Sequence, residues 1–171
     1  YGFMLVHPGK KLLFMGQDFG QYQEWSEERE LDWYLLGEQS HQQLQNYVKQ
    51  LFALYKKYPA LYANDANPQG LEWINADDAT RSIYSFMRMS PTGRNNLLFV
   101  INYTPVARDD YRVGVPKRKQ YKLILNSREP EFGGHEHKEQ TIYKAVKKEC
   151  DGRPYSFAYP LPAYGVAVFL F

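Results

Sequence analysis

Cysteine is almost missing from this sequence. Its 171 residues include a single cysteine, Cys150, so no disulfide bond can form within the chain. Disulfides are common in extracellular proteins and rare in the reducing cytosol. The composition therefore favours a reducing compartment, and we expect a cytoplasmic protein.

Long apolar segments are missing as well. The longest is "YGVAVFLF", residues 164–171, far shorter than the ~20 apolar residues that a membrane-spanning helix requires. The first residues show no basic stretch followed by an apolar core, which is the pattern of a signal peptide. We therefore expect no membrane partner.

Neither sign of charge predominates. The chain carries 21 lysines and arginines against 19 aspartates and glutamates, a net charge of +2. Domains that bind nucleic acid usually concentrate far more positive charge than this, so we expect no nucleic-acid partner. The basic clusters "PKRKQYK" and "KAVKK" fit exposed β segments better than they fit a phosphate site.

Motifs for a cofactor, a metal or a nucleophile are not found. There is no glycine-rich phosphate loop, no G-x-S-x-G elbow and no EF-hand spacing. His135 and His137 in "GGHEH" are metal-ligand residue types, but no third histidine or cysteine lies at a zinc-site spacing from them. We therefore expect no metal site and no cofactor.

The sequence is rich in aromatic residues and divides into two contrasting halves. Aromatics make up 16% of the chain, and tyrosine alone contributes 15 residues. In the second half, turn residues separate five short β-rich runs: "GLEWINAD", "SIYSFMRMS", "NNLLFVINYTP", "YKLILNS" and "AYGVAVFLF". Short strands at such intervals are typical of an antiparallel sandwich or barrel. We predict an all-β sandwich domain over residues 65–171.

The first half, residues 1–64, predicts one strand and one helix. Leu12–Met15 is apolar without alternation, which is typical of a strand buried on both faces inside a parallel sheet. Apolar residues recur at helical spacing over residues 40–57 and predict a helix there. Ser40 and Gln43 have the spacing of a capping box at the start of this helix.

One covered strand and one helix cannot close a hydrophobic core of their own. We therefore expect residues 1–64 to be an incomplete unit, either packed on the β domain or completed by further polypeptide. The first residue is Tyr1 and not methionine, which we interpret as a sign of a longer parent protein. Apolar residues left without their neighbours would favour self-association of the chain.

Polar and aromatic residues gather in the loop that follows the predicted strand. Four of them have the side-chain types of a sugar site: Gln17, Asp18, Gln21 and Trp25. Amides and carboxylates bond hydroxyl groups, and an indole ring stacks on the apolar face of a pyranose. Asp18 and Glu24 would also suit the paired carboxylates of a glycosidase. The alternative, that these acids only cap helices and solvate a loop, is the commoner outcome for acidic loops.

Trp73 in "LEWIN" is a further candidate. An exposed tryptophan flanked by Glu72 and Asn75 would offer a platform for the apolar face of a glucan. A tryptophan buried between two sheets is the competing interpretation, because tryptophan side chains are substantially buried on average.

Several blocks of the sequence resemble a known family. "HPGKKLLFMGQDFGQYQEW" and "RELDWYLL" resemble the last barrel strand and the following loop of bacterial 1,4-α-glucan (glycogen) branching enzymes. "NPQGLEWINADDATRSIYSFMR" and "NNLLFVINYTPVARDDYRVGVP" resemble the start of the C-terminal β domain of these enzymes, and "LPAYGVAVFLF" resembles its last strand. Many members of the family carry glutamate where this chain carries Asp18.

The resemblance implies a mainly β fold. A C-terminal antiparallel β-sandwich, residues 65–171, would follow the last strand and helix of a (β/α)₈ barrel, residues 1–64. It also implies a glucan-branching glycosyltransferase of glycogen biosynthesis, which cleaves α-1,4 links with retention and transfers the chain to a 6-hydroxyl. In that family the three catalytic acids lie on earlier barrel strands. No catalytic residue therefore maps onto this chain, and we expect the chain alone to be inactive.

The implied partner is an α-glucan such as glycogen or a malto-oligosaccharide. Gln17, Asp18, Gln21 and Trp25 would lie at the rim of the barrel mouth, and Trp73 would hold a glucan chain on the outer surface. Two alternatives stay open. The chain could be a stand-alone carbohydrate-binding or interaction module, or the tail of a related debranching or amylolytic hydrolase.

Overall fold

Two α-helices and eight strands form the regular framework of the chain in the computed structural model, which describes residues 1–137 and 140–171. The α-helices are α1 (Gly2–Val6) and α2 (Gln39–Lys57). Four short 3-10 helices are η1 (Trp33–Gly37), η2 (Pro59–Leu61), η3 (Pro68–Gly70) and η4 (Pro130–Phe132). The strands are β1 (Leu71–Asn75), β2 (Ile83–Arg88), β3 (Leu97–Asn102), β4 (Arg108–Val115), β5 (Gln120–Asn126), β6 (Ile142–Lys144), β7 (Tyr155–Leu161) and β8 (Val166–Leu170).

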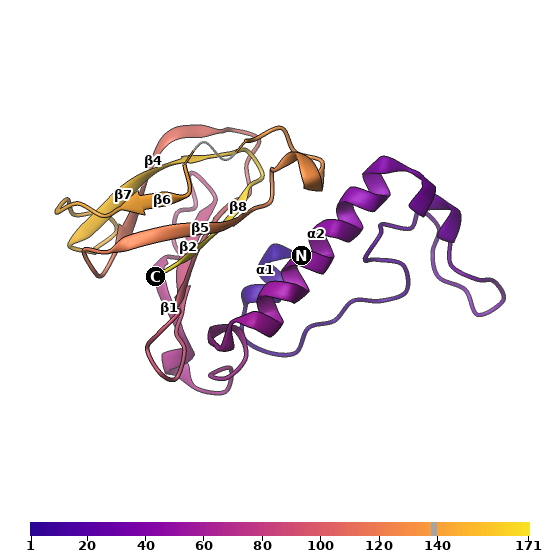
Figure 1. Ribbon diagram of the computed structural model, residues 1–171, viewed down its shortest axis with the longest axis horizontal. Helices are drawn as coiled ribbons and strands as arrows, with labels where there is room; N and C mark the ends of the chain where they lie inside the picture. Colours follow the sequence, from indigo (N-terminus) through magenta and orange to yellow (C-terminus); the bar gives the residue numbers. More distant parts are fainter. Residues whose placement is uncertain (138–139) are drawn as a thin grey trace.

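The strands form two sheets, and every strand pair is antiparallel. The larger sheet has six strands in the order β1-β2-β3-β8-β5-β6, and β4 pairs with β7 in a second sheet. The strands of both sheets can be followed in Figure 1, and apolar side chains from both sheets pack together in one core. The predicted mainly β, antiparallel fold is therefore confirmed. The assignment of residues 1–64 to a (β/α)₈ barrel, and the domain boundary after residue 64, stay predictions.

The central strand β3 is covered on both of its faces. All six residues of "LLFVIN" are buried. Because side chains alternate along a strand, Leu98 and Val100 face the core shared with β4 and β7, whereas Leu97, Phe99 and Ile101 face a second core. Because both faces of β3 are covered, its residues are apolar throughout and do not alternate with polar residues, although the sheet is antiparallel.

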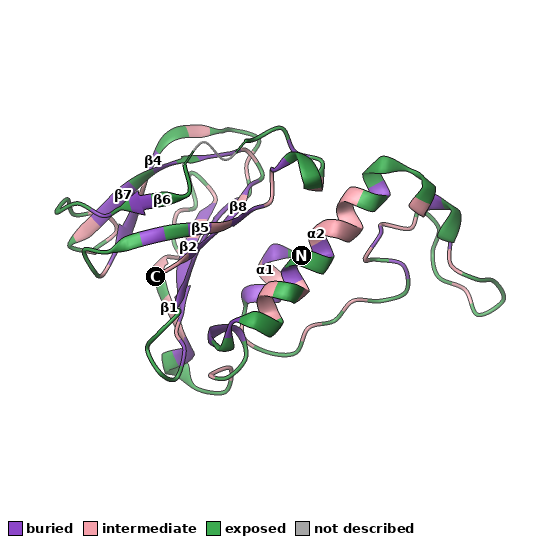
Figure 2. Ribbon diagram, in the orientation of Figure 1, coloured by how far each residue is buried: buried purple, intermediate pink, exposed green. Residues whose placement is uncertain are grey.

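The helical half supplies the cover for that second face of the large sheet. Leu5 and Val6 of α1 and Leu51 of α2 belong to the same buried cluster as the strand residues. Figure 2 shows buried segments in α1 and α2. The other end of α2 is fixed by polar contacts, since Gln43 Nε2 donates to the Pro130 carbonyl at 3.0 Å. The helices of residues 1–64 therefore pack on the β domain, and completion of this segment by further polypeptide stays a prediction.

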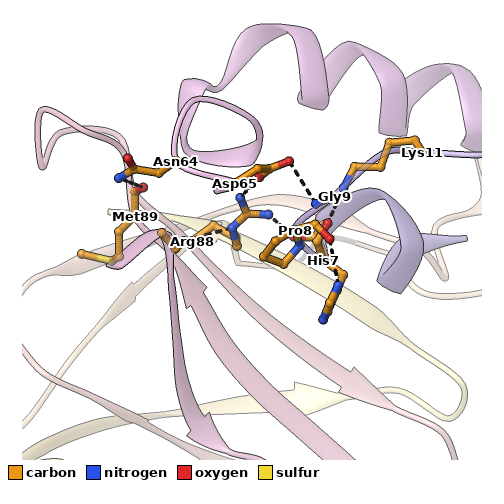
Figure 3. Close-up of polar contacts among 10 residues, drawn as sticks. His7, Pro8, Gly9, Lys11, Asn64, Asp65, Arg88 and Met89 are labelled. Carbon is orange, nitrogen blue, oxygen red and sulfur yellow. Dashed lines mark hydrogen bonds and ion pairs between the residues drawn. The ribbon is translucent and has the colours of Figure 1, made fainter. Parts of the chain in front are cut away.

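A buried arginine ties the two halves together (Figure 3). The side chain of Arg88, at the end of β2, is 0% exposed. Its Nε donates to the Gly70 carbonyl at 3.0 Å, its Nη1 donates to the Val6 carbonyl at the end of α1, and its Nη2 bonds the Asp65 carboxylate. The other Asp65 oxygen accepts from the Gly9 backbone nitrogen at 3.1 Å. One guanidinium thus joins α1, the connecting segment and the sheet.

The predicted strand at Leu12–Met15 is wrong. Residues 10–14 have no regular secondary structure, and Leu12 is 74% exposed. A strand requires a hydrogen-bonded neighbour, and none of the described residues pairs with this segment. The segment runs as an extended connection alongside α2 (Figure 1).

The predicted helix over residues 40–57 is confirmed by α2, but its capping box is wrong. The N-cap is Glu38 and its side chain makes no capping hydrogen bond. Gln43 cannot act as the partner of Ser40, because its amide reaches across to the Pro130 carbonyl instead. The Gln43 side chain therefore contacts η4 and does not cap its own helix.

All five predicted β runs form strands: β1, β2, β3, β5 and β8. Strands β4, β6 and β7 and the short helix α1 were not predicted. Strand β7 contains Pro160, which cannot donate a ladder hydrogen bond, and β4 begins with the charged run Arg108–Asp110. Both belong to the two-stranded sheet, where an unpaired edge tolerates such residues.

Candidate functional site

The loop at residues 14–25 is organised by its own backbone. The Gln17 nitrogen donates to the Phe14 carbonyl at 2.9 Å, and the Gln21 nitrogen donates to the Gly16 carbonyl at 3.1 Å. Gly16 has a left-handed φ of +78°, and a side chain there would meet Gln21 at 2.9 Å. Only glycine meets both requirements, so the "MGQ" sequence fixes this tight turn.

A buried histidine anchors the loop to α2. The ring nitrogen Nδ1 of His41 lies 2.7 Å from the Phe19 carbonyl, and because a carbonyl only accepts, this nitrogen carries the proton. Phe19 is fully buried and packs on Trp33 with 5.3 Å between ring centroids. These contacts hold the otherwise irregular loop against the start of the helix.

The two candidate glutamines make contacts within the loop. Gln17 Oε1 accepts from the Phe14 nitrogen at 2.9 Å. Gln21 Oε1 accepts from the Asp32 nitrogen, and its Nε2 donates to the Gln23 carbonyl, both at 2.9 Å. Both amide oxygens are therefore committed to holding the loop, which gives each glutamine a structural role.

Asp18 lies in a hollow of about 590 Å³ between the loop and α2. Its Oδ2 accepts from Gln45 Nε2 at 3.5 Å, and Lys49 Nζ donates to the same glutamine's Oε1 at 2.9 Å. Apolar side chains, including Phe14 and Phe52, line most of the remainder. The hollow therefore offers one carboxylate beside apolar walls.

Trp25 lies at a second hollow of about 500 Å³, which Gln17 and Gln21 also line. The indole packs edge-on to Phe14 with 5.4 Å between ring centroids and is 38% exposed. Phe14 also lines the hollow beside Asp18, so the two hollows are neighbours. The structure thus brings Gln17, Gln21 and Trp25 together, with Asp18 next to them.

Trp73 lies apart from this loop, on the edge strand β1 (Figure 1). Its ring contacts the fully buried Phe86 at 5.0 Å between centroids, yet the side chain is 37% exposed. The interpretation of Trp73 as a tryptophan buried between the two sheets is wrong, because its contact Phe86 belongs to the cluster on the face covered by the helices. A role as a glucan platform stays a prediction. The ring rests on the core while its outer part faces solvent.

Sequence reasoning missed three aromatic residues beside Trp73. Phe3, Tyr84 and Tyr103 line a pocket of about 470 Å³ together with Trp73 and Ser82. The alternation in "SIYSFMR" signals that Tyr84 and Phe86 share a face of β2. Finding Phe3 there required the docked position of α1, which no local pattern gives.

Neither a metal cluster nor a membrane helix appears in the described part of the chain. Over residues 1–137 and 140–171, no group of three or more His, Cys, Asp or Glu is placed to hold a metal ion. Over the same residues, no helix has both the length and the apolar character needed to cross a membrane.

The fold is that of an all-β sandwich domain whose outer sheet face is covered by helices. Over residues 73–171 the chain matches the family described as "Alpha amylase, C-terminal all-beta domain", and it belongs to this family.

The most informative relatives are branching enzymes. The chain is 50% identical over all 171 of its residues to the 1,4-alpha-glucan branching enzyme GlgB of Butyrivibrio fibrisolvens, and it covers 27% of that protein. It is 42% identical over 168 residues to the GlgB of Bacillus caldolyticus, which is 98% of this chain and 25% of that protein. The resemblance predicted from the sequence is confirmed. The chain spans about a quarter of the length of these relatives.

Similarity to solved structures is weaker. The isomaltulose synthase from Erwinia rhapontici NX5 matches with a TM-score of 0.45 and 16% identity, over 74% of this chain and 17% of that one. A similarity of this size supports no conclusion about the function.

Proposed function

We propose that this chain is the C-terminal part of a glycogen-branching enzyme that acts on α-glucan in the cytoplasm. The observation that carries the proposal is the 50% identity to a 1,4-alpha-glucan branching enzyme over the whole length of the chain. The reaction cleaves an α-1,4 link and transfers the released chain to a 6-hydroxyl. Retention in such a reaction requires two carboxyl groups about 5–5.5 Å apart across the scissile bond.

The catalytic acids of the proposed enzyme lie outside these 171 residues. We assign them to the longer protein because none of the family's three acids maps onto this sequence. The part played by this chain is to support the catalytic domain and to contact glucan. Within the loop, Trp25 would stack on a glucose ring and Asp18 would accept hydrogen bonds from its hydroxyls, while Gln17 and Gln21 hold the loop in shape.

A branching assay tests this proposal. The longer protein that carries this sequence is incubated with amylose, and loss of the iodine-complex absorbance is followed together with the appearance of α-1,6 links in the product. We expect branching by the longer protein and none by the 171-residue chain, because the chain lacks the acid pair. Products with only hydrolysed α-1,4 links, or branching by the chain alone, would contradict the proposal.

We also propose that the 171-residue chain associates with itself. Large apolar side chains that the loop and η1 leave exposed support this, among them Leu12, Phe14, Met15, Trp33 and Tyr34. Exposed apolar surface of this extent marks an interaction surface or an association-prone one.

A further inference from the structure

A groove of about 660 Å³ lies between the last turns of α2 and the outer face of the large sheet. Leu54 and Lys57 of α2 line one side, and Lys122 and Ile124 of β5 line the other, together with Leu170 of β8. No residue of the loop at 14–25 takes part. The volume falls in the usual range of small-molecule sites, so the groove is large enough for a ligand of its own.

The groove carries two positive charges and no negative one. Lys57 and Lys122 enter it from opposite sides, and no carboxylate among the described residues lines it or pairs with either ammonium. The whole of α2, β5 and β8 is free of aspartate and glutamate, although the chain has 19 of them against 21 basic residues. Charges of one sign that gather in a cleft attract ligands of the opposite sign.

The charge at the end of a helix offers only a partial explanation for these lysines. Lys56 and Lys57 occupy the last turn of α2, where cations offset the partial negative charge of the helix C-terminus. Lys122 belongs to a strand instead, and its partners in the two neighbouring strands are the uncharged Leu170 and Ile142. Two cations of separate structural origin thus face one space without a counter-charge.

The rim of the groove is held in place before any ligand arrives. Lys57 Nζ lies 5.4 Å from the centroid of the Tyr58 ring, which is itself buried. Asn95 also lines the groove and has a left-handed φ of +54°, a conformation that asparagine tolerates better than most residues. Its neighbour Asn96 exchanges backbone hydrogen bonds of 3.1 and 3.0 Å with Phe171. A rim fixed in this way loses little conformational freedom on binding, which favours affinity.

The remaining lining is suited to the body of an organic molecule. Leu54, Ile124 and Leu170 provide apolar contacts, and the amides of Gln50 and Asn95 can donate to hydroxyl or ring oxygens and accept from hydroxyl groups. A ligand that matches the whole groove therefore combines an anionic group, an apolar part and a few hydrogen-bonding groups.

We propose that this groove binds an organic phosphate, with the phosphate group between Lys57 and Lys122. A phosphate monoester carries about −1.5 to −2 charges near neutral pH and three strong acceptor oxygens, so it can take charge-assisted hydrogen bonds from both ammonium groups. Sugar phosphates and nucleotides share this chemistry. The site goes beyond the proposed branching function and does not depend on it. A ligand bound there would bridge the helical half of the chain and the β domain.

Isothermal titration calorimetry on the 171-residue chain tests the proposal. Glucose 6-phosphate and AMP are the two organic phosphates, glucose and adenosine are their uncharged counterparts, and inorganic phosphate supplies the charge without an organic body. We expect saturable binding of at least one ester, at least about fivefold weaker binding of inorganic phosphate, and none of the uncharged compounds. The tighter of the two esters identifies the source as a sugar phosphate or a nucleotide. Raising the salt from about 20 to about 200 mM should weaken binding several-fold.

Lysine variants test whether the groove itself binds. Both lysines are exposed, so Lys57→Gln and Lys122→Gln should fold normally, and we expect each to weaken binding of the ester at least about fivefold. Lys148→Gln is the matched control, because it removes the same charge from an exposed lysine outside the groove. This control should change the affinity less than twofold. Lys57→Arg and Lys122→Arg keep the charge and should retain most of the binding, which separates loss of charge from misfolding.

Three results would overturn the inference. They are the absence of saturable binding by both esters, equal affinity for inorganic phosphate and the esters, and an equal loss of affinity in Lys148→Gln and the groove variants. The branching assay is independent of all three. A chain that fails to bind the esters leaves the proposed enzyme intact, and a longer protein that fails to branch amylose leaves the groove intact.

Discussion

Arg88 illustrates how one residue holds distant segments together. Its buried guanidinium bonds two carbonyls, those of Val6 and Gly70, and the Asp65 carboxylate. A charge removed from water is tolerated only when it is paired and hydrogen-bonded. Here both conditions are met by groups that belong to α1, the connecting segment and the end of η3, so the arginine can be satisfied only when all three are in place.

We expect Arg88→Met to lower the free energy of unfolding by about 3–5 kcal/mol, because the variant leaves Asp65 and two carbonyls without their partner. Urea denaturation followed by circular dichroism measures this loss. Glu72→Gln is the comparison variant, since the Arg153–Glu72 pair has a glutamate side chain that is 44% exposed. That change should cost at most about 1 kcal/mol. Similar losses in the two variants would show that the Arg88 network contributes no more than a surface ion pair.

At the scale of the element, β4 shows how closely the second sheet is packed. Gly114 is the last residue but one of this strand, in its buried second half, and a Cβ atom there would come within 2.2 Å of the Cys150 carbonyl oxygen. The backbone of the turn after residue 149 therefore rests directly on the strand. Glycine is required at this position for close approach, with no demand on φ.

We expect Gly114→Ala to destabilise the protein by about 1–3 kcal/mol, since the backbone must shift to accept the methyl group. Gly37→Ala provides the matched control, because a Cβ atom at Gly37 meets nothing within 4 Å. Its effect should stay within about 0.5 kcal/mol. The stability losses of the two variants are compared through their denaturation midpoints. Equal midpoints would contradict the close packing of β4.

The individual helices and strands also show which parts of the fold could be predicted from the sequence. Helix α2 and strands such as β3 have long apolar patterns that stand alone, so local reasoning finds them. Leu12–Met15 has an equally apolar pattern but lacks a pairing partner, and pairing is a property of the whole sheet. The missed strand β7 is interrupted by Pro160, which only its position in a two-stranded sheet makes acceptable.

The two candidate sites differ in the same respect, because one depends on local sequence and the other depends on the assembled sheet. Gln17, Gln21 and Trp25 are close in sequence, and the turn at Gly16 keeps them close in space. Tyr84 and Tyr103 reach Trp73 only through the register of three strands. Local sequence therefore revealed the loop, whereas the aromatic pocket required the assembled sheet.

For the molecule as a whole, the exposed loop is the feature with the largest consequence. We expect the 171-residue chain to sediment and scatter light as a species heavier than its 20.1 kDa monomer, because the apolar surface at Leu12 and Phe14 is open to solvent. Replacing both residues with serine should shift the chain towards the monomer. Static light scattering over a range of concentrations is the measurement.

Val146→Ser serves as the control for that experiment, since Val146 is an exposed apolar residue on the β side of the molecule. It should leave the mass unchanged. A monomeric parent chain at every concentration, or an equal effect of the Val146 change, would contradict association through the loop.

The strand order has a consequence for synthesis on the ribosome. Strand β8 is made after the other seven strands described here, yet it lies between β3 and β5 in the large sheet. Until Leu170 has left the exit tunnel, the nascent sheet remains divided into two separate parts with open edges. A chain that stops before β8 would therefore lack the middle of the sheet and not its border.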